Sequence, residues 1–126
     1  MCNSEVREIM IEDNMRSVAN LIPDLLDEYP ALFYQGQFDC RDGVAMVEAM
    51  LRNLDWYGVP EYLNATRTVW YTNNNVGGMT RSYQNLYQCV VVGAGHLVPM
   101  NQGAASLDMV KRFIYNFHGI TKKTIY

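Results

Sequence analysis

Two residues of this sequence, Asp39 and His96, have the side chains of a proton-transfer pair. Each lies in a turn just after a short apolar run, in YQGQFD at 34–39 and in GAGHLVP at 93–99. An imidazole can take a proton from a hydroxyl group and return it to a leaving group, because its unperturbed pKa lies near ~6.5. A carboxylate on the other ring nitrogen fixes the tautomer and stabilises the imidazolium. The pair would suit catalysis that begins with a hydroxyl nucleophile.

The elements that must position Asp39 follow from apolar spacing. Met15, Val18, Ile22, Leu25, Leu26 and Tyr29 recur at helical intervals and predict a helix over residues 14–28. Pro23 should kink this helix or delay its start. Residues 31–34 then form a short buried strand, and residues 43–54 form a second helix that ends near Gly58 and Pro60.

The elements around His96 are a hairpin, a strand and a helix. Residues 66–72 alternate and are rich in Thr, Val, Trp and Tyr, and the turn cluster at 73–78 leads into a partner strand at 79–83. The β-branched run at 89–92 predicts a buried parallel strand. Leu107, Val110, Phe113, Ile114 and Phe117 mark a last helix that Gly119 stops, with a frayed tail at 120–126.

Asp39 and His96 thus follow the carboxyl ends of two predicted parallel strands, where open α/β sheets place their sites. An acid followed by a histidine is the chain order of an α/β-hydrolase triad, in which the nucleophilic serine comes first. No G-x-S-x-G motif occurs in the sequence. We therefore predict an α/β fold in which residues 1–126 form a single unit, the C-terminal fragment of an α/β-hydrolase domain.

Composition argues against several other classes of function. The net charge is -3 and the ten Lys and Arg residues are scattered, so a nucleic-acid partner is not expected. The longest apolar run, CVVVGAG, is far shorter than the ~20 residues of a membrane helix, and residues 1–20 lack a signal-peptide layout. Two histidines and scattered thiols offer no metal spacing, so we expect no metal and no cofactor.

Longer motifs around the pair identify a family. YQGQFDCRDG at 34–43 and GAGHLVPMNQGAASLDMVKRFI at 93–114 resemble the acid and histidine blocks of serine carboxypeptidases, including the plant-type enzymes. LDWYGVPEYLNATRTVW and TRSYQNLYQCVVVGAGH resemble the segment between these blocks. The resemblance covers residues 15–117. It implies an α/β-hydrolase fold, an acyl-enzyme mechanism and removal of C-terminal residues from peptides in vacuoles, lysosomes or outside the cell.

The resemblance also assigns roles to single residues. It makes Asp39 the triad acid, His96 the triad base and Leu97 a lining residue of the leaving-group pocket. The nucleophile elbow and the oxyanion amides lie upstream in the family, so this chain alone should be inactive, and an N-terminal part or a second chain would supply the serine. Two alternatives stay open, which are an acyltransferase of the same fold and a truncated remnant without catalytic function.

The loop after His96, the cysteines and the tryptophans support further expectations. Where relatives have Asp-Gln-Pro, this chain has Asn101, Gln102 and Gly103, and Asn can cap the helix that follows. Cys40 and Cys89 should be too far apart for a disulfide, since Cys89 lies near the far end of its strand. Trp56 and Trp70 could form a ligand-stacking patch, although packing is the favoured role.

Overall fold

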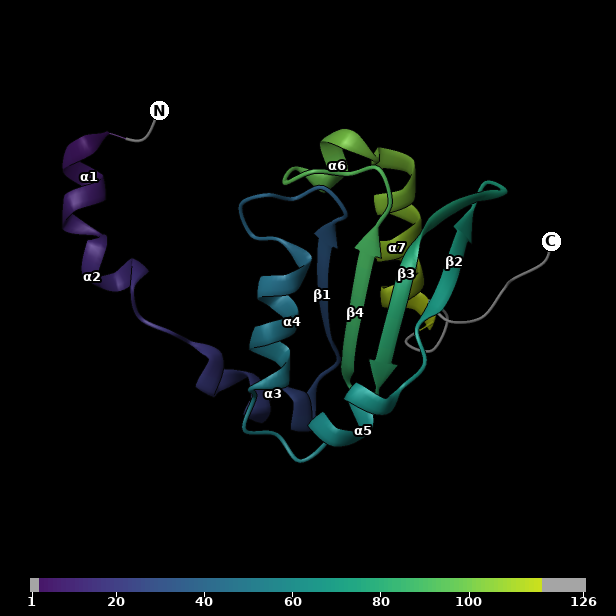
Figure 1. The fold of residues 1–126 in the computed structure, drawn as a ribbon, viewed down its shortest axis with the longest axis horizontal. Coiled ribbons are helices and arrows are strands. Elements are labelled where there is room, and N and C mark those ends of the chain that lie inside the picture. The colour runs from purple at the N-terminus through teal and green to yellow at the C-terminus, as the bar shows by residue number, and fades with distance from the viewer. Residues whose placement is uncertain (1–2, 117–126) are drawn as a thin grey trace.

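The structure is a computed structural model that describes residues 3–116 and contains a mixed four-stranded sheet (Figure 1). The strands are β1 (Ala31–Gly36), β2 (Thr68–Thr72), β3 (Asn75–Tyr83) and β4 (Leu86–Val91), in the order β1-β4-β3-β2 across the sheet. β1 and β4 are parallel, whereas β3 is antiparallel to both of its neighbours. Helices cover both faces, so the predicted α/β class is confirmed.

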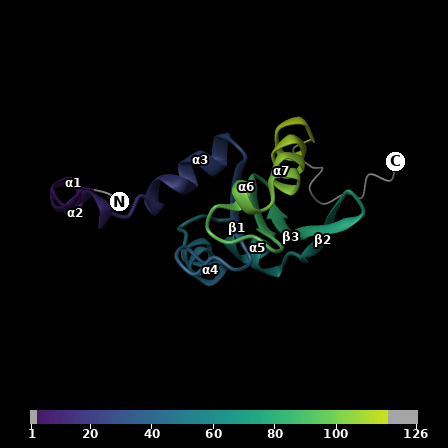
Figure 2. The ribbon, with the colours of Figure 1, turned by 90° about the horizontal axis from the view of Figure 1, so that it is seen from above.

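The helices lie in two layers and in an arm. They are α1 (Ser4–Ile9), α2 (Ile11–Asn14), the 3-10 helix η1 (Ala19–Leu21), α3 (Ile22–Glu28), α4 (Val44–Arg52), α5 (Val59–Asn64), α6 (Val98–Asn101) and α7 (Gly103–Asn116). α4 and α7 lie on opposite sides of the sheet (Figure 2). α1 and α2 bury no residue and extend away from the sheet, beyond β1 (Figures 1 and 2). Within residues 3–116, no helix combines the length and apolar character that crossing a bilayer requires.

Each face of the sheet has its own apolar core. The cluster under α4 and α5 contains Leu26, Leu51, Leu54, Trp56, Val59, Tyr62 and Leu86. The cluster under α7 contains Trp70, Cys89, Val91, Ala94, Val98, Ala105 and Met109. Both tryptophans are at least 95% buried, at 5% and 2% exposure, so they pack in the core and form no ligand-stacking patch.

The sheet follows the sequence pattern closely. The predicted strands at 31–34 and 89–92 correspond to β1 and β4, which pair in register from Ala31 with Leu86 to Gly36 with Val91. The hairpin turn is tighter than the predicted 73–78 cluster, because β3 already begins at Asn75. Within that cluster Asn73 and Asn74 have positive φ angles, of 47° and 63°. Asn tolerates this left-handed region, and two such residues make the turn whose twist matches a hairpin.

The predicted helix over 14–28 is wrong in its first half. α2 ends at Asn14, and α3 begins only at Ile22, after the 3-10 turn. Pro23 lies at the start of α3, where its missing N–H costs nothing, whereas a helix running through it would lose a hydrogen bond. The late start that Pro23 suggested is therefore the outcome.

The later helices agree better with expectation. The predicted helix at 43–54 is α4, and the predicted final helix is α7, which begins four residues earlier than its first predicted apolar position, Leu107. The sequence pattern does not predict α5, because Pro60 suggests the end of a helix, whereas it lies in the first turn of a new one. Phe117, the stop at Gly119 and the tail at 120–126 lie outside the described residues.

Candidate functional site

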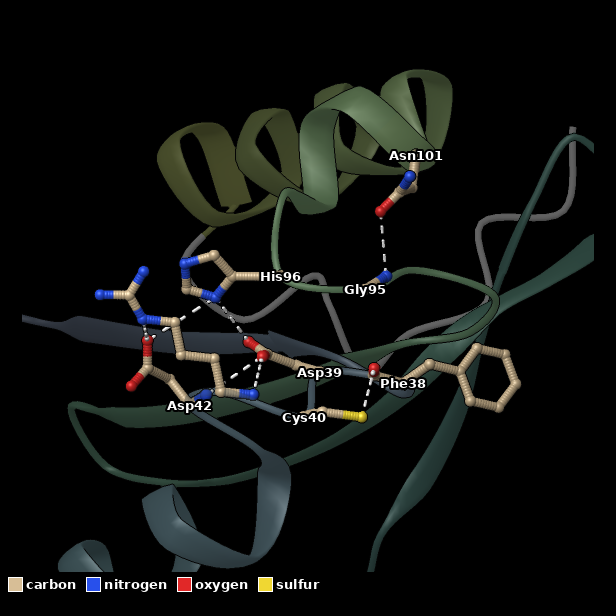
Figure 3. A network of polar contacts seen from close by, with 8 residues as sticks. Phe38, Asp39, Cys40, Asp42, Gly95, His96 and Asn101 are labelled. Atoms are coloured by element: carbon tan, nitrogen blue, oxygen red, sulfur yellow. Dashed lines mark hydrogen bonds and ion pairs between the residues drawn. The ribbon is translucent and has the colours of Figure 1, made fainter. Parts of the chain in front are cut away.

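The parallel pairing of β1 and β4 brings Asp39 and His96 together. Gly36 pairs with Val91 at the carboxyl ends of the two strands, and the loop that follows each strand therefore begins at the same end of the sheet. Nδ1 of His96 lies 3.1 Å from Oδ2 of Asp39, across 57 positions of sequence (Figure 3). The two residues that the sequence singled out are thus in contact.

Asp39 is fixed by its own loop. Its Oδ1 accepts the backbone N–H groups of Arg41 at 2.9 Å and Asp42 at 3.0 Å, which leaves Oδ2 for His96. The N–H of Asp42 contributes most to lowering the pKa of this carboxyl, and burial opposes it. The N–H of Arg41 and the ring of His96 lower the pKa further. The side chain is only 6% exposed, so the carboxylate presents one oxygen to the ring in a fixed direction.

His96 is oriented for proton transfer. Its side chain is 45% exposed, so a reactant can reach the ring. With an ionised Asp39 facing Nδ1, that nitrogen carries the hydrogen and Nε2 is left as the free base. This is the tautomer that a general base toward a hydroxyl group requires.

A second carboxylate, which the sequence did not single out, also faces the ring. Oδ2 of Asp42 lies 3.6 Å from Nδ1 of His96 (Figure 3). The Asp42 side chain is 62% exposed, and Nε of Arg41 lies 3.9 Å from the same oxygen. Solvent and Arg41 therefore screen this charge, and Asp39 is the dominant partner of the ring.

The loop that carries His96 is tied down on both sides. Gly95 donates its N–H to Oδ1 of Asn101 at 3.0 Å (Figure 3). Gly93, whose φ is +74°, donates its N–H to Oε1 of Gln37 at 3.2 Å. Phe38 donates its N–H to the carbonyl of Ala94 at 2.8 Å and so joins the loops that carry Asp39 and His96 directly.

These contacts correct one expectation and add two positioning residues. Asn101 does not cap α7, because it ends α6 and its side chain turns back to Gly95. Gln37 and Asn101 were missed as positioning residues, since both act through backbone groups that a sequence pattern does not reveal.

Leu97, Cys40 and Cys89 have distinct settings. Leu97 directly follows His96 and is 59% exposed, at the rim of the site. Cys40 is an exposed free thiol whose Sγ lies 3.6 Å from the carbonyl of Phe38. Cys89 is a buried free thiol on β4, so the prediction that the two are unpaired is confirmed.

The arrangement can perform proton transfer, and within residues 3–116 no serine or threonine hydroxyl is given a contact with His96. In residues 3–116 no three His, Cys, Asp or Glu side chains gather as metal ligands would. The polar groups facing the ring of His96 are the carboxylates of Asp39 and Asp42. A hydroxyl supplied to the Nε2 side would complete a triad.

Comparison with known proteins gives a consistent result. A family model described as serine carboxypeptidase matches residues 1–116. "Probable serine carboxypeptidase CPVL" of Dictyostelium discoideum is 36% identical over 117 residues, which are 90% of this chain and 23% of that protein. "Venom serine carboxypeptidase" of Apis mellifera is 36% identical over 114 residues, which are 90% of this chain and 24% of the relative.

Comparison of structures agrees on the fold. The crystal structure of Kex1, a prohormone-processing carboxypeptidase from Saccharomyces cerevisiae, matches with a TM-score of 0.68 and 23% identity. The match covers 79% of this chain and 22% of that chain, and the fold is the predicted α/β-hydrolase fold. The chain spans about a quarter of the length of the curated relatives it matches.

Proposed function

Because this chain belongs to the serine carboxypeptidase family, we propose that Asp39 and His96 are the acid and base of a serine-type carboxypeptidase site. One observation carries this proposal, which is the 3.1 Å contact between Nδ1 of His96 and Oδ2 of Asp39. It leaves Nε2 free to act on a hydroxyl group. The substrate is a peptide, and the bond that breaks is its last peptide bond.

The reaction divides into two halves. In the first, a serine hydroxyl gives its proton to Nε2 of His96 while its oxygen attacks the carbonyl carbon, and Asp39 stabilises the imidazolium. The C–N bond then breaks, and the departing amine takes that proton, which leaves an acyl-serine. In the second half, water loses a proton to Nε2 and attacks the ester, and the serine leaves with that proton. The products are the shortened peptide and a free amino acid.

The serine itself comes from outside these 126 residues, since they contain no G-x-S-x-G motif. Leu97, at the rim beside His96, would line the pocket for the departing residue. Membership of the family supports a vacuolar, lysosomal or secreted location. The lowered pKa of Asp39 keeps its carboxylate charged in the acidic ones among these compartments.

A chimaera tests this function without requiring separate chains to associate. The 117-residue matched segment of the Dictyostelium relative is replaced by this chain, and release of the C-terminal amino acid from an N-blocked dipeptide is measured. We expect activity in the chimaera and a loss of at least about 10³-fold in kcat for His96→Ala and Asp39→Asn.

The matched control is Asp55→Asn, which removes one exposed carboxylate in the segment between α4 and α5. It should keep the activity of the chimaera. An inactive chimaera with a folded sheet, or a His96→Ala variant as active as its parent, would refute the proposal. Ester formation from an added alcohol in place of hydrolysis would favour the acyltransferase alternative.

A further inference from the structure

Asn64, Ala65 and Thr66 form an Asn-x-Thr tripeptide that the proposed function does not use. Its middle residue is not proline, so it has the pattern of an acceptor for N-linked glycosylation. No other asparagine of the sequence is followed two positions later by serine or threonine. Asn64 is the last residue of α5, and Thr66 lies in the segment that leads to β2. Such tripeptides also arise by chance, so the setting of Asn64 in the fold is what counts.

The side chains of this tripeptide are accessible and unbonded. Both Asn64 and Thr66 are exposed. Within residues 3–116, neither side chain takes part in a hydrogen bond or an ion pair. Other asparagines of the fold do use their amides, since Nδ2 of Asn53 donates to a backbone carbonyl at 2.7 Å and Nδ2 of Asn85 does so at 2.8 Å. The amide nitrogen of Asn64 is therefore free to react.

The backbone gives no reason for an asparagine at position 64 either. Asparagine tolerates a positive φ angle, and Asn73 and Asn74 adopt one in the hairpin turn. Asn64 does not have a positive φ, and Ala65 after it is extended, with φ −65° and ψ 135°. Asparagine also has a lower helix propensity than most residues. Neither a hydrogen bond nor a special backbone conformation explains this residue, whereas modification of its amide does.

The tripeptide lies at the end of the sheet opposite to the candidate site (Figure 1). β2 is antiparallel to β3, and β3 is antiparallel to β4, so β2 runs in the same direction as β4. Asn64 precedes the amino end of β2, whereas His96 follows the carboxyl end of β4. The 6 residues of β4, at ~3.3 Å each, separate these ends by roughly 20 Å. A bulky group on Asn64 would thus leave access to the ring of His96 open.

We propose that Asn64 is an N-glycosylation site, which receives its glycan in the secretory pathway from a lipid diphosphate-linked oligosaccharide. The proposal rests on the proposed function for its location, because vacuolar, lysosomal and secreted proteins enter this pathway. In the transfer, Nδ2 of Asn64 attacks C1 of the first sugar and forms an N–C bond. The bond from C1 to the diphosphate oxygen breaks, and the lipid diphosphate leaves. The proton that Nδ2 loses passes to a base of the transferase, which recognises the hydroxyl of Thr66.

The chimaera described above tests the proposal when it is expressed in eukaryotic cells with an added secretory leader. Trypsin releases residues 53–67 as one peptide, because Arg52 and Arg67 bound a stretch without Lys or Arg. This peptide is analysed by mass spectrometry before and after treatment with an amidase that removes N-linked glycans and leaves aspartate. We expect the treatment to convert Asn64 to aspartate, and fragment ions to leave Asn53 unchanged. Both secreted and retained protein are analysed, because transfer occurs as the chain enters the lumen, so poor folding does not hide the result.

Four variants separate the tripeptide from the fold. Asn64→Gln and Thr66→Ala should each abolish the glycan, whereas Thr66→Ser keeps the hydroxyl and should retain it. Asn14→Gln is the matched control, because Asn14 is also an exposed asparagine at the last position of a helix, α2, but lies outside the pattern. It should be glycosylated like the unmodified chimaera. None of these residues contacts His96, so kcat/KM of the secreted protein should be unchanged in all four variants.

The results bear separately on the glycan and on the function. An active chimaera in which Asn64 is unmodified overturns the glycosylation site and leaves the proposed function standing. Loss of the glycan in Asn14→Gln, or a glycan on residues 53–67 that persists in Asn64→Gln, also overturns the site. A chimaera that carries the glycan on Asn64 but releases no amino acid refutes the function alone.

Discussion

Replacing Gly36 with alanine should separate the two loops that hold Asp39 and His96. A Cβ at Gly36 would lie 2.2 Å from the carbonyl oxygen of Gly95 and 2.4 Å from that of Ala94. Real Cβ atoms essentially never approach closer than 3.0 Å, so the loop must retreat by at least 3.0 − 2.2 = 0.8 Å. Gly36 does not have a positive φ, so this steric conflict is the whole effect.

The backbone of Ala94 and Gly95, which must move away from the new Cβ, is held in place by hydrogen bonds. Phe38 donates to Ala94, and Gly95 donates to Asn101, so moving the loop weakens both hydrogen bonds. Overpacking of this kind costs about 1–3 kcal/mol of unfolding free energy. His96 follows Gly95 directly, so a retreat of 0.8 Å along the line of the 3.1 Å contact would take the pair beyond hydrogen-bond range. Misplacement on the order of 1 Å costs roughly 10²-fold in rate.

Urea denaturation of the chain measures the first effect, and kcat/KM of the chimaera measures the second. Gly103→Ala is the matched control, because a Cβ there meets nothing within 4 Å at the first residue of α7. It should leave stability unchanged or raise it by about 0.5 kcal/mol. Gly36→Ala with the stability and activity of Gly103→Ala would refute the steric argument.

Three further predictions address charge and thiol chemistry. Because the pKa of Asp39 is lowered in the folded state, its ionised form adds stability above pH ~4 that is lost as pH falls through the lowered pKa. The stability difference between the unmodified chain and Asp39→Asn, from urea midpoints at pH 3 to 7, should therefore shrink toward acid, and a constant difference would contradict this. Burial raises the pKa of Cys89 to about 12, whereas the thiol of Cys40 is exposed. At pH 8 iodoacetamide should therefore label Cys40 and leave Cys89 unlabelled until the chain is unfolded. Peptide mass mapping measures the labelling of each cysteine, and equal labelling of both in the folded chain would contradict this. Glu48→Gln should lower the unfolding free energy by about 1–3 kcal/mol, because Glu48 pairs with the guanidinium groups of Arg67 and Arg81, and the Arg81 side chain is only 10% exposed. An unchanged urea midpoint would show that the two ion pairs contribute nothing to stability.

The sequence predicted the sheet better than its helical surroundings. Apolar runs and alternation predict β1, β4 and the β2–β3 hairpin. The contact of Asp39 with His96 follows from the rule that parallel strands gather sites at their carboxyl ends. The first predicted helix failed in its first half, because Pro23 lies in the first turn of α3 and a helix running through it would lose a hydrogen bond. Gln37 and Asn101 were not predictable, since each binds a backbone N–H whose position exists only after the strands pair.

The separation of the pair along the chain has a consequence for the order of folding. The β2–β3 hairpin and the β3–β4 pairing close loops of a few residues, whereas the β1–β4 ladder joins positions 55 apart, from Ala31 with Leu86 to Gly36 with Val91. Local pairings form quickly, and non-local ones must first overcome the entropy of closing a long loop. The antiparallel half of the sheet should therefore form first and act as the template on which β1 aligns. Asp39 reaches His96 only in that last step, so the chemistry of the site reports completion of folding.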